Sequence, residues 1–192
     1  MSKLKKDFYL RDDVIQISKD LLGKYIFTKF NGKTTAGIIT ETEAYAGIID
    51  KASHAWNGRR TNRTEIMYGE AGVAYVYLCY GIHHLFNIVT NKKEVPHAVL
   101  IRAITPVEGI PYILKRRNKT KTDKSTAGGP GTVSQALGIL TKHSGTDLTG
   151  NKIWIEDKGI KVKEKEIIVG PRIGVDYAGE DAGLLYRFIY SP

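Results

Sequence analysis

The chain has few of the residues from which covalent and metal-bound frameworks are built. Cys79 is the one cysteine among 192 residues, so an internal disulfide and a zinc site made of several cysteines are both excluded. We interpret Cys79 as a small buried hydrophobe. His83 and His84 alternate across an expected strand and have no cysteine partner, so no metal site is predicted there.

Long apolar segments are absent as well. No stretch approaches the roughly 20 apolar residues of a membrane-spanning helix. The N-terminal residues contain no apolar core of the kind that signal peptides have. We therefore expect a soluble chain that stays inside the cell.

Acidic residues are outnumbered by basic ones. The chain has 20 Asp and Glu against 29 Lys and Arg, which gives a formal net charge of +9. An excess of this size attracts polyanions; nucleic acid is the leading candidate and a membrane surface is the other. Because 42% of the residues are apolar, the chain can bury a core, and we expect residues 1–192 to form a single domain.

Short strands joined by hairpin signals alternate with a few helices. Asp12 or Asp13 can cap a helix that Gly23 ends. The Asn31-Gly32 pair suits a type I′ turn between strands at 24–30 and 33–45. We predict an α+β fold, in which a mostly antiparallel, curved sheet carries flanking helices and a protruding β-hairpin.

The protruding hairpin is expected at residues 73–87, with its break at Gly81-Ile82. Tyr75 and Tyr77 then share one face of the first strand. Tyr80 lies at the tip. It is either an ordinary edge residue or a wedge inserted between bases.

Two other expected strands carry charged residues. On the strand at 33–45, simple alternation points one set of side chains to the same face: Ile39, Glu41, Glu43 and Tyr45. Arg102 interrupts the apolar strand at 97–104, so it needs a partner or a ligand. The plain alternatives are a solvent-facing Glu43 and a structural ion pair for Arg102.

Three polar segments have open interpretations. Residues 47–72, which include Arg63, are irregular and are expected to form a functional loop. The basic run from Lys115 to Lys124 is either a solvated loop or a phosphate-binding segment. The glycines at 128–131 precede an expected helix, and they suit either a phosphate or an ordinary helix start.

A set of motifs spread along the chain resembles the 3-methyladenine (alkyladenine) DNA glycosylase family. The resemblance extends from the first helix almost to the C-terminus, and no single motif carries it. The motifs are Glu41-Thr42-Glu43-Ala44-Tyr45, Asp50-Lys51-Ala52-Ser53-His54, Tyr75-Val76-Tyr77 with Tyr80-Gly81, Asn87, Ala98 to Ala103, Gly129-Pro130-Gly131, Gln135 to Ile139, Pro171-Arg172-Ile173-Gly174 and Arg187-Phe188.

The resemblance implies a role for each matching residue. Such an enzyme flips a damaged nucleotide out of the duplex and hydrolyses the bond between base and sugar. Glu43 matches the general base and Arg102 the cation that orients the attacking water. The base pocket would consist of Tyr45 and His54 on one side of the base, Tyr77 on the other, and Asn87, which excludes guanine. Tyr80 would be the intercalating wedge, and Gly129, Gly131 and Thr132 would hold the DNA backbone. The basic residues Arg63, Lys115, Arg116 and Arg117 are expected to contact the DNA backbone as well, because of their charge.

Further expectations follow from these roles. Thr132 stands where the family usually has Lys, so one phosphate contact is expected to be missing. Asn87 and Tyr77 must face the same pocket, which a two-residue turn at Gly81-Ile82 would prevent; we therefore predict an odd-numbered loop or a bulge. We also predict that Arg102 lowers the pKa of Glu43 below its reference value of about 4.3.

The implied partner is double-stranded DNA containing damaged purines, and neither a cofactor nor a metal is required. We expect a monomer that is cytoplasmic or nucleoid-associated in a prokaryote, or nuclear in a eukaryote. A non-catalytic protein that bends DNA in the minor groove or senses damage is the main alternative. An RNA-binding module that stacks bases on Tyr75 and Tyr77 is another. The lesion spectrum does not follow from the sequence.

Overall fold

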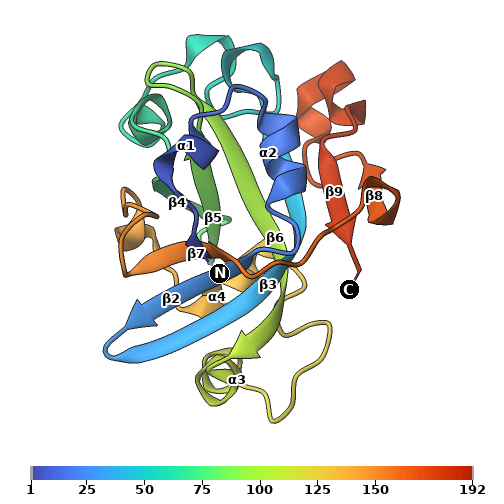
Figure 1. Ribbon diagram of the computed structural model, residues 1–192. Helices are drawn as coiled ribbons and strands as arrows, with labels where there is room; N and C mark the ends of the chain where they lie inside the picture. The colour runs from blue at the N-terminus through green and yellow to red at the C-terminus, as the bar shows by residue number, and fades with distance from the viewer. Residues whose placement is uncertain (1, 192) are drawn as a thin grey trace.

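The computed structural model describes residues 2–191 (Figure 1). The strands are β1 (Ser2–Lys3), β2 (Tyr25–Phe30), β3 (Lys33–Tyr45), β4 (Ala74–Cys79), β5 (His83–Thr90), β6 (His97–Glu108), β7 (Ile153–Asp157), β8 (Ile167–Gly170) and β9 (Arg187–Tyr190). The α-helices are α1 (Lys6–Tyr9), α2 (Val14–Asp20), α3 (Ile110–Arg117) and α4 (Pro130–Leu137). Short 3-10 helices span Gly47–Ile49, Trp56–Gly58, Glu65–Tyr68, Thr141–His143, Glu164–Glu166 and Asp176–Gly183.

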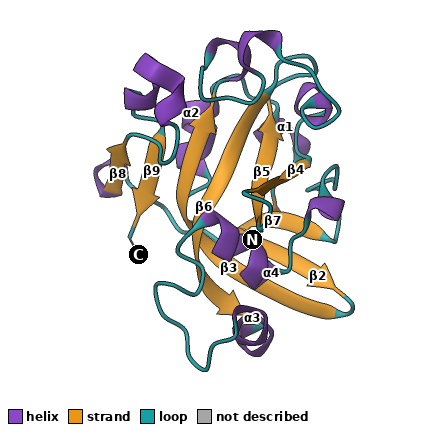
Figure 2. Ribbon diagram, turned by 180° about the vertical axis from the view of Figure 1, so that it is seen from behind, coloured by secondary structure: helices purple, strands orange, loops and turns teal. Residues whose placement is uncertain are grey.

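All nine strands belong to one sheet in which neighbouring strands run antiparallel. The main order is β1-β7-β2-β3-β6-β5-β4, and β9 pairs with β3 beyond the end of β2 while β8 pairs with β9. Helix α2 packs on one face of this sheet, in front of β3 and β6 in Figure 1, and α4 covers β5 and β6 from the other face in Figure 2. The predicted α+β fold with a mostly antiparallel sheet is confirmed.

Local sequence signals explain where the first elements begin and end. The side chain of Asp13 accepts a hydrogen bond from the Gln16 backbone N–H at 2.9 Å, which caps α2. Gly23 follows the helix with a φ of +76°, a conformation that glycine adopts without strain. The β2–β3 turn places both Asn31 and Gly32 at positive φ (51° and 73°), as a type I′ turn requires.

Besides a register shift between Ala36 and Gly37, two bulges interrupt the pairing of β3 with β6. Ile39 pairs with Ile104, Glu41 with Ala103 and Thr42 with Ile101, so Thr40 and then Arg102 are left as extra residues. A bulge redirects a side chain and shifts the alternation of the strand. The simple alternation that placed Ile39 beside Glu41 does not hold across the first bulge: Ile39 is fully buried in the main hydrophobic core with Ile101 and Ile104.

The β4–β5 hairpin has an odd-numbered loop. Cys79 pairs with His83, which leaves Tyr80, Gly81 and Ile82 between the strands. Tyr80 and Gly81 both have positive φ (51° and 72°), and the Ile82 N–H donates to the Cys79 carbonyl at 3.2 Å to close a tight turn. Ile82 is therefore the extra residue that makes the loop odd-numbered, which decides which side chains of β4 and β5 lie on the same face.

Candidate functional site

A cavity of about 590 Å³ lies between the β4–β5 hairpin, the 3-10 segments near residues 52 and 175, and the N-terminus of α4. Aromatic side chains dominate its walls. Of the residues singled out from the sequence, its surface includes Tyr45, His54, Tyr77, Tyr80, Asn87, Arg102, Gly129, Gly131 and Thr132. The fold thus brings together residues that are almost 90 positions apart.

Glu43 lies beneath this cavity with no exposed surface of its own. Its Oε2 accepts a hydrogen bond from the Tyr45 hydroxyl at 2.8 Å, and its Oε1 accepts one from the Ile173 backbone N–H at 2.9 Å. Arg102 Nη1 is 3.3 Å from the same Oε1. Tyr45, Arg102 and Ile173 all border the cavity, so the partners of the carboxylate lie between it and the cavity.

The pKa of Glu43 is raised from its ordinary value, chiefly because burial disfavours the charged carboxylate. Arg102 and the hydrogen bonds from Ile173 and Tyr45 act in the opposite direction, but they do not offset the burial. The prediction of a lowered pKa was therefore wrong. It took account of the neighbouring cation but not of the complete loss of solvent around Glu43.

Arg102 sits at the bulge of β6 and connects two glutamates. Its Nε donates to Glu41 Oε1 at 2.9 Å, and Arg187 Nη1 lies 3.2 Å from the same oxygen. Glu41 therefore holds both arginines in place while Arg102 also faces Glu43. The partner that an isolated arginine in an apolar strand requires is this pair of carboxylates.

Tyr45 is fixed by a buried ion pair behind its ring. The Arg172 guanidinium lies 4.8 Å from the ring centroid and forms two hydrogen bonds with the Asp50 carboxylate, at 2.5 and 2.9 Å. Both charged side chains are almost completely buried. Burial and the neighbouring Glu43 raise the pKa of the Tyr45 hydroxyl well above its usual range, so it stays protonated and donates to that carboxylate.

His54 is held by two tyrosines of β4. Its Nδ1 lies 2.8 Å from the Tyr75 hydroxyl, and its ring meets the ring of Tyr77 edge to face with centroids 4.7 Å apart. Two rings that flank a base must be about 7 Å apart, twice the usual contact distance. His54 and Tyr77 therefore touch each other here and enclose no gap. Burial, and then Arg63 and Arg59, lower the pKa of His54 to about 4, so the imidazole is neutral near pH 7.

Asn87 is buried and lies directly across from Tyr75 in the hairpin register. Its Nδ2 donates to the carbonyls of Tyr75 and Leu85, at 3.2 and 3.4 Å. Because Leu85 pairs with Tyr77, Asn87 and Tyr77 are on the same face. The prediction that an odd-numbered loop would bring these two side chains to one pocket is confirmed.

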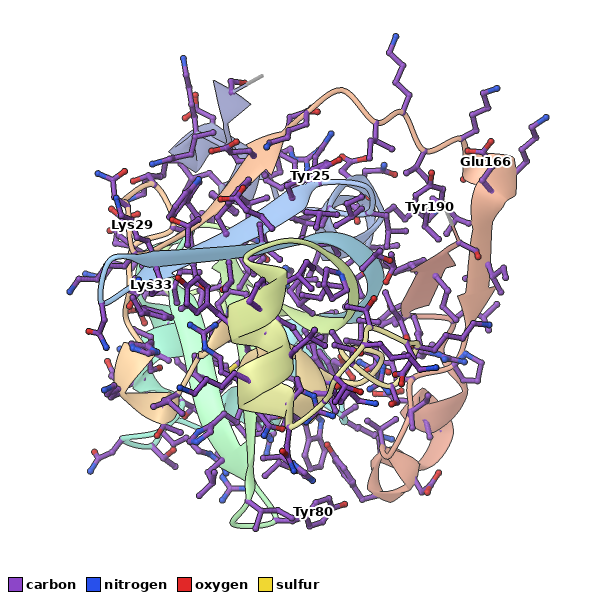
Figure 3. The ribbon with its side chains drawn as sticks, turned by 90° about the horizontal axis from the view of Figure 1, so that it is seen from below. Tyr25, Lys29, Lys33, Tyr80, Glu166 and Tyr190 are labelled. Carbon is purple, nitrogen blue, oxygen red and sulfur yellow. The ribbon has the colours of Figure 1, made fainter. Side chains whose placement is uncertain are left out.

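Tyr80 projects from the hairpin tip, at the bottom of Figure 3, and is 89% exposed. Its positive φ is unusual for a bulky residue and strains the backbone. Tyr80 also lines the cavity, so its ring stands at the cavity's edge.

The glycine segment forms the wall opposite the β3 residues. The Thr132 hydroxyl accepts from the Gly129 N–H at 3.0 Å and donates to the Gly129 carbonyl at 2.7 Å, which closes the first turn of α4. Gly131 approaches His83 so closely that a Cβ would lie 2.9 Å from its ring. Thr132 is thus engaged in capping α4.

The basic residues expected at the DNA backbone have different environments. Arg63 and Lys115 are exposed. Arg116 Nη1 donates to Thr35 Oγ1 and the Ala136 carbonyl, at 3.1 and 2.9 Å, and Arg117 bonds to the Thr126 carbonyl at 2.8 Å and to the Gln135 side chain. The guanidinium groups of Arg116 and Arg117 therefore connect α3 to α4 and to the ordered segment that follows α3.

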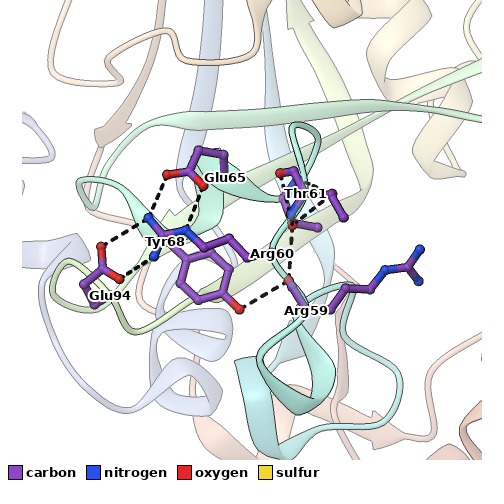
Figure 4. A network of polar contacts seen from close by, with 7 residues as sticks. Arg59, Arg60, Thr61, Glu65, Tyr68 and Glu94 are labelled. Carbon is purple, nitrogen blue, oxygen red and sulfur yellow. Dashed lines mark hydrogen bonds and ion pairs between the residues drawn. The ribbon is translucent and has the colours of Figure 1, made fainter.

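The polar loop at 47–72 is held by Arg60 (Figure 4). Its guanidinium forms ion pairs with Glu65 at 2.7 Å and with Glu94 at 2.6 Å and stacks on the Tyr68 ring at 4.6 Å. The Arg59 side chain extends away from this cluster. Arg60 is thus committed to the loop itself, while its neighbours Arg59 and Arg63 are left at the surface near His54.

Several contacts within the site were not predicted from the sequence. Glu41 and Arg187 hold Arg102, Ile173 donates its N–H to Glu43, Tyr75 holds His54, and the ion pair of Asp50 with Arg172 supports Tyr45. All of them lie within the motifs that carry the family resemblance. Neither the residue types nor their spacing along the sequence indicates which atom each side chain contacts. Within residues 2–191, no three His, Cys, Asp or Glu side chains are grouped so as to hold a metal ion, and no helix is long and apolar enough to cross a membrane.

Comparison with known proteins identifies the family of the chain. The methylpurine-DNA glycosylase family matches residues 7–192. The "Putative 3-methyladenine DNA glycosylase" of Chlamydia felis is 47% identical over 189 residues, which cover 98% of this chain and 96% of the relative. Proteins of the same name from Clostridium perfringens and Bacillus cereus are 43% and 44% identical, over 97% and 95% of this chain and 94% and 93% of their own. The chain belongs to the methylpurine-DNA glycosylase family.

Proposed function

We propose that the protein is a monofunctional DNA glycosylase that releases alkylated purines from double-stranded DNA by hydrolysis and leaves an abasic site. The observation that carries the proposal is the position of Glu43. A buried carboxylate with a cation beside it lies under an aromatic cavity, and an exposed tyrosine stands at the cavity's edge. The cavity is complete within one chain, which supports action as a monomer.

Tyr80 would enter the minor groove and fill the space that the flipped nucleotide leaves. The extruded base would stack on the aromatic walls, where each stacking contact is worth about 1–3 kcal/mol. Tyr45 and Tyr77 would supply these faces. Because the His54 ring contacts the Tyr77 ring directly, these two side chains would have to separate before a base could enter between them. Asn87, at the buried end of the same face, would crowd the exocyclic amine of guanine.

Glu43 would accept a proton from water while the water oxygen attacks C1′ of the sugar. The bond from C1′ to the purine nitrogen breaks, and its electron pair stays with the base. A purine alkylated at N3 or N7 is positively charged, so this electron pair neutralises it and the base leaves easily. An ionised carboxylate has about four acceptor positions; Tyr45, Ile173 and Arg102 take three, and one is left for the water.

Base release tests the proposal directly. A duplex carrying a single methylated purine should yield free base and an abasic site, and the strand should stay intact until alkali is added. Borohydride should trap no covalent complex, because no lysine borders the cavity. A panel of methylpurine, hypoxanthine and etheno lesions would then define the lesion spectrum.

Glu43→Gln keeps the size of the side chain and removes the proton acceptor. It should bind the lesion duplex nearly as well as the parent and lose roughly 100-fold or more in base release, as removal of a general base commonly does. Glu41→Gln is the matched control, because it changes a neighbouring carboxylate that also contacts Arg102; its loss should be smaller. Tight binding of lesion DNA with no base release by the parent would instead identify a non-catalytic damage-sensing protein.

A further inference from the structure

A second depression, of about 410 Å³, lies at the other end of α4, beside its C-terminus. We call it the basic groove. It is lined by Lys29, Phe30, Asn31, Arg116, Gly138, Leu140, Lys142, His143 and Lys152. Among residues 2–191, the lining has four basic residues besides His143 and no carboxylate, so the groove suits an anion.

The lysines of the basic groove carry unpaired charge. In the part of the chain that the structure describes, the lysines in salt bridges are Lys6, Lys19, Lys24, Lys51, Lys119 and Lys158. Lys29, Lys142 and Lys152 are not among them, and all three are exposed. Their charges are available to a partner outside the chain.

The floor of the groove is rigid. The ring of Phe30 stacks on His143 with centroids 4.3 Å apart and an interplanar angle of 7°. His143 Nδ1 also accepts from the Leu140 N–H at 3.0 Å, and the Arg116 guanidinium closes one wall through its bond to the Ala136 carbonyl at 2.9 Å. The three lysines therefore project from a fixed surface.

The groove is joined to the hairpin that carries Tyr80. The Thr141 N–H donates to His84 Nδ1 at 3.2 Å, and the Val76 N–H donates to Ser144 Oγ at 3.2 Å. His84 pairs with Leu78, which is two residues before Tyr80, or about 7 Å along β4 at roughly 3.3 Å per residue. The groove begins at this contact and extends away from the tip. In Figure 3 Lys29 lies at the left of the molecule and Tyr80 at the bottom.

We propose that the basic groove binds the phosphate backbone of the duplex that flanks the lesion, about half a helical turn from Tyr80. A turn of B-DNA is about 34–36 Å long, so phosphates roughly half a turn from the wedge come within reach of the lysines at 29, 142 and 152. The inference rests on the proposed function, because it takes the DNA to be placed by Tyr80. It adds a contact on the flank, outside the base pocket and away from the glycine segment.

A triple variant tests the groove. Lys29→Gln, Lys142→Gln and Lys152→Gln together remove three positive charges and keep most of each side chain. The matched control changes Lys161, Lys163 and Lys165 to Gln. These lysines are equally exposed and flank Glu166, which lies at the corner of Figure 3 opposite Tyr80.

The measurements are the salt dependence of binding and single-turnover base release at saturating enzyme, both with a 30-bp lesion duplex. The logarithm of the affinity falls as the logarithm of the salt concentration rises, and each lost phosphate contact makes this slope shallower by about 0.9. The slope of the groove variant should therefore be shallower than that of the parent by up to about 2.7, and the rate at which bound DNA releases its base should be unchanged. The control variant should change the slope much less.

A second measurement locates the contact on the DNA. Neutral methylphosphonates are placed in turn at phosphates along each flank. Parent affinity should fall for a cluster about half a turn from the lesion, and the groove variant should be insensitive there. Equal slopes for groove variant and parent, or identical methylphosphonate profiles, would overturn the proposal. If the parent binds the duplex but releases no base, the proposed function fails while the groove result still stands or falls on the binding data.

Discussion

The Tyr45 hydroxyl donates to Glu43 Oε2 at 2.8 Å, and this bond covers a carboxylate that has no exposed surface. Tyr45 therefore belongs both to the wall of the base pocket and to the environment that sets the charge of the proposed base. In the proposed function, binding of the base and proton transfer are therefore coupled through this one side chain. The pH dependence of base release should show the coupling.

Tyr45→Phe should move the acid limb of base release to higher pH. In the parent, the limb should already lie above the ordinary glutamic acid pKa of 4.5, because burial raises the pKa of Glu43. The Tyr45 bond favours the ionised form, so its loss raises the pKa further. Tyr177→Phe is the control, since that hydroxyl lines the same cavity but donates to the Ala52 carbonyl at 3.0 Å. If the acid limbs of the parent and of Tyr45→Phe lie at the same pH, the Tyr45 hydroxyl does not influence the pKa of Glu43.

The raised pKa of Glu43 also predicts how stability varies with pH. The folded protein takes up the Glu43 proton more readily than the unfolded chain, so protonation of Glu43 adds to the free energy of unfolding. This stabilisation is fully present below the unfolded pKa of about 4.3. It is lost as the pH rises through the folded pKa. The free energy of unfolding of the parent, minus that of Glu43→Gln, should therefore decrease from pH 4 to pH 7 in urea titrations. A difference that grows with pH would mean that Arg102 outweighs the burial.

Replacement of Tyr80 should reduce base release while leaving the stability of the fold nearly unchanged. Tyr80→Gly relieves a positive φ that costs roughly 1–2 kcal/mol, and glycine loses about 0.5–1 kcal/mol through added flexibility. The stability should stay within about 1 kcal/mol of the parent, and Tyr80→Ala should be no more stable than Tyr80→Gly. Both variants should lose more base release on a well-paired lesion than on the same lesion opposite a mismatch. Equal activity of variants and parent on both substrates would remove the wedge role.

The buried pair behind Tyr45 should be the most sensitive position for stability. Arg172→Met leaves the Asp50 carboxylate buried without its cation, and the loss of one partner of such a pair costs about 3–5 kcal/mol. Asp50→Asn combined with Arg172→Met should recover part of that loss, because no buried charge is left. Denaturant unfolding checks both variants. A single variant within about 1 kcal/mol of the parent would show that solvent reaches Asp50 freely.

Local signals were enough to predict the ends of α2, the β2–β3 turn and the antiparallel character of the sheet. The parity of the central hairpin could also be predicted, because the family resemblance required Asn87 and Tyr77 to share a face, which an odd-numbered loop or a bulge allows. The bulges at Thr40 and Arg102 could not, since they depend on how β3 and β6 meet across 60 residues of chain. The direction of the Glu43 pKa was missed for a related reason: burial is a property of the assembled fold.

The pairing of β9 with β3 has a consequence for synthesis of the protein. Arg187 and Ile189 of β9 pair with Glu43 and Glu41, and Ile173 supplies the N–H that holds Glu43 Oε1. A ribosome that has completed residue 160 has already made the β4–β5 hairpin and α4, but neither these partners nor Tyr177 of the cavity wall. The surroundings of Glu43 are therefore completed only after the end of the chain has been synthesised and β9 has paired with β3.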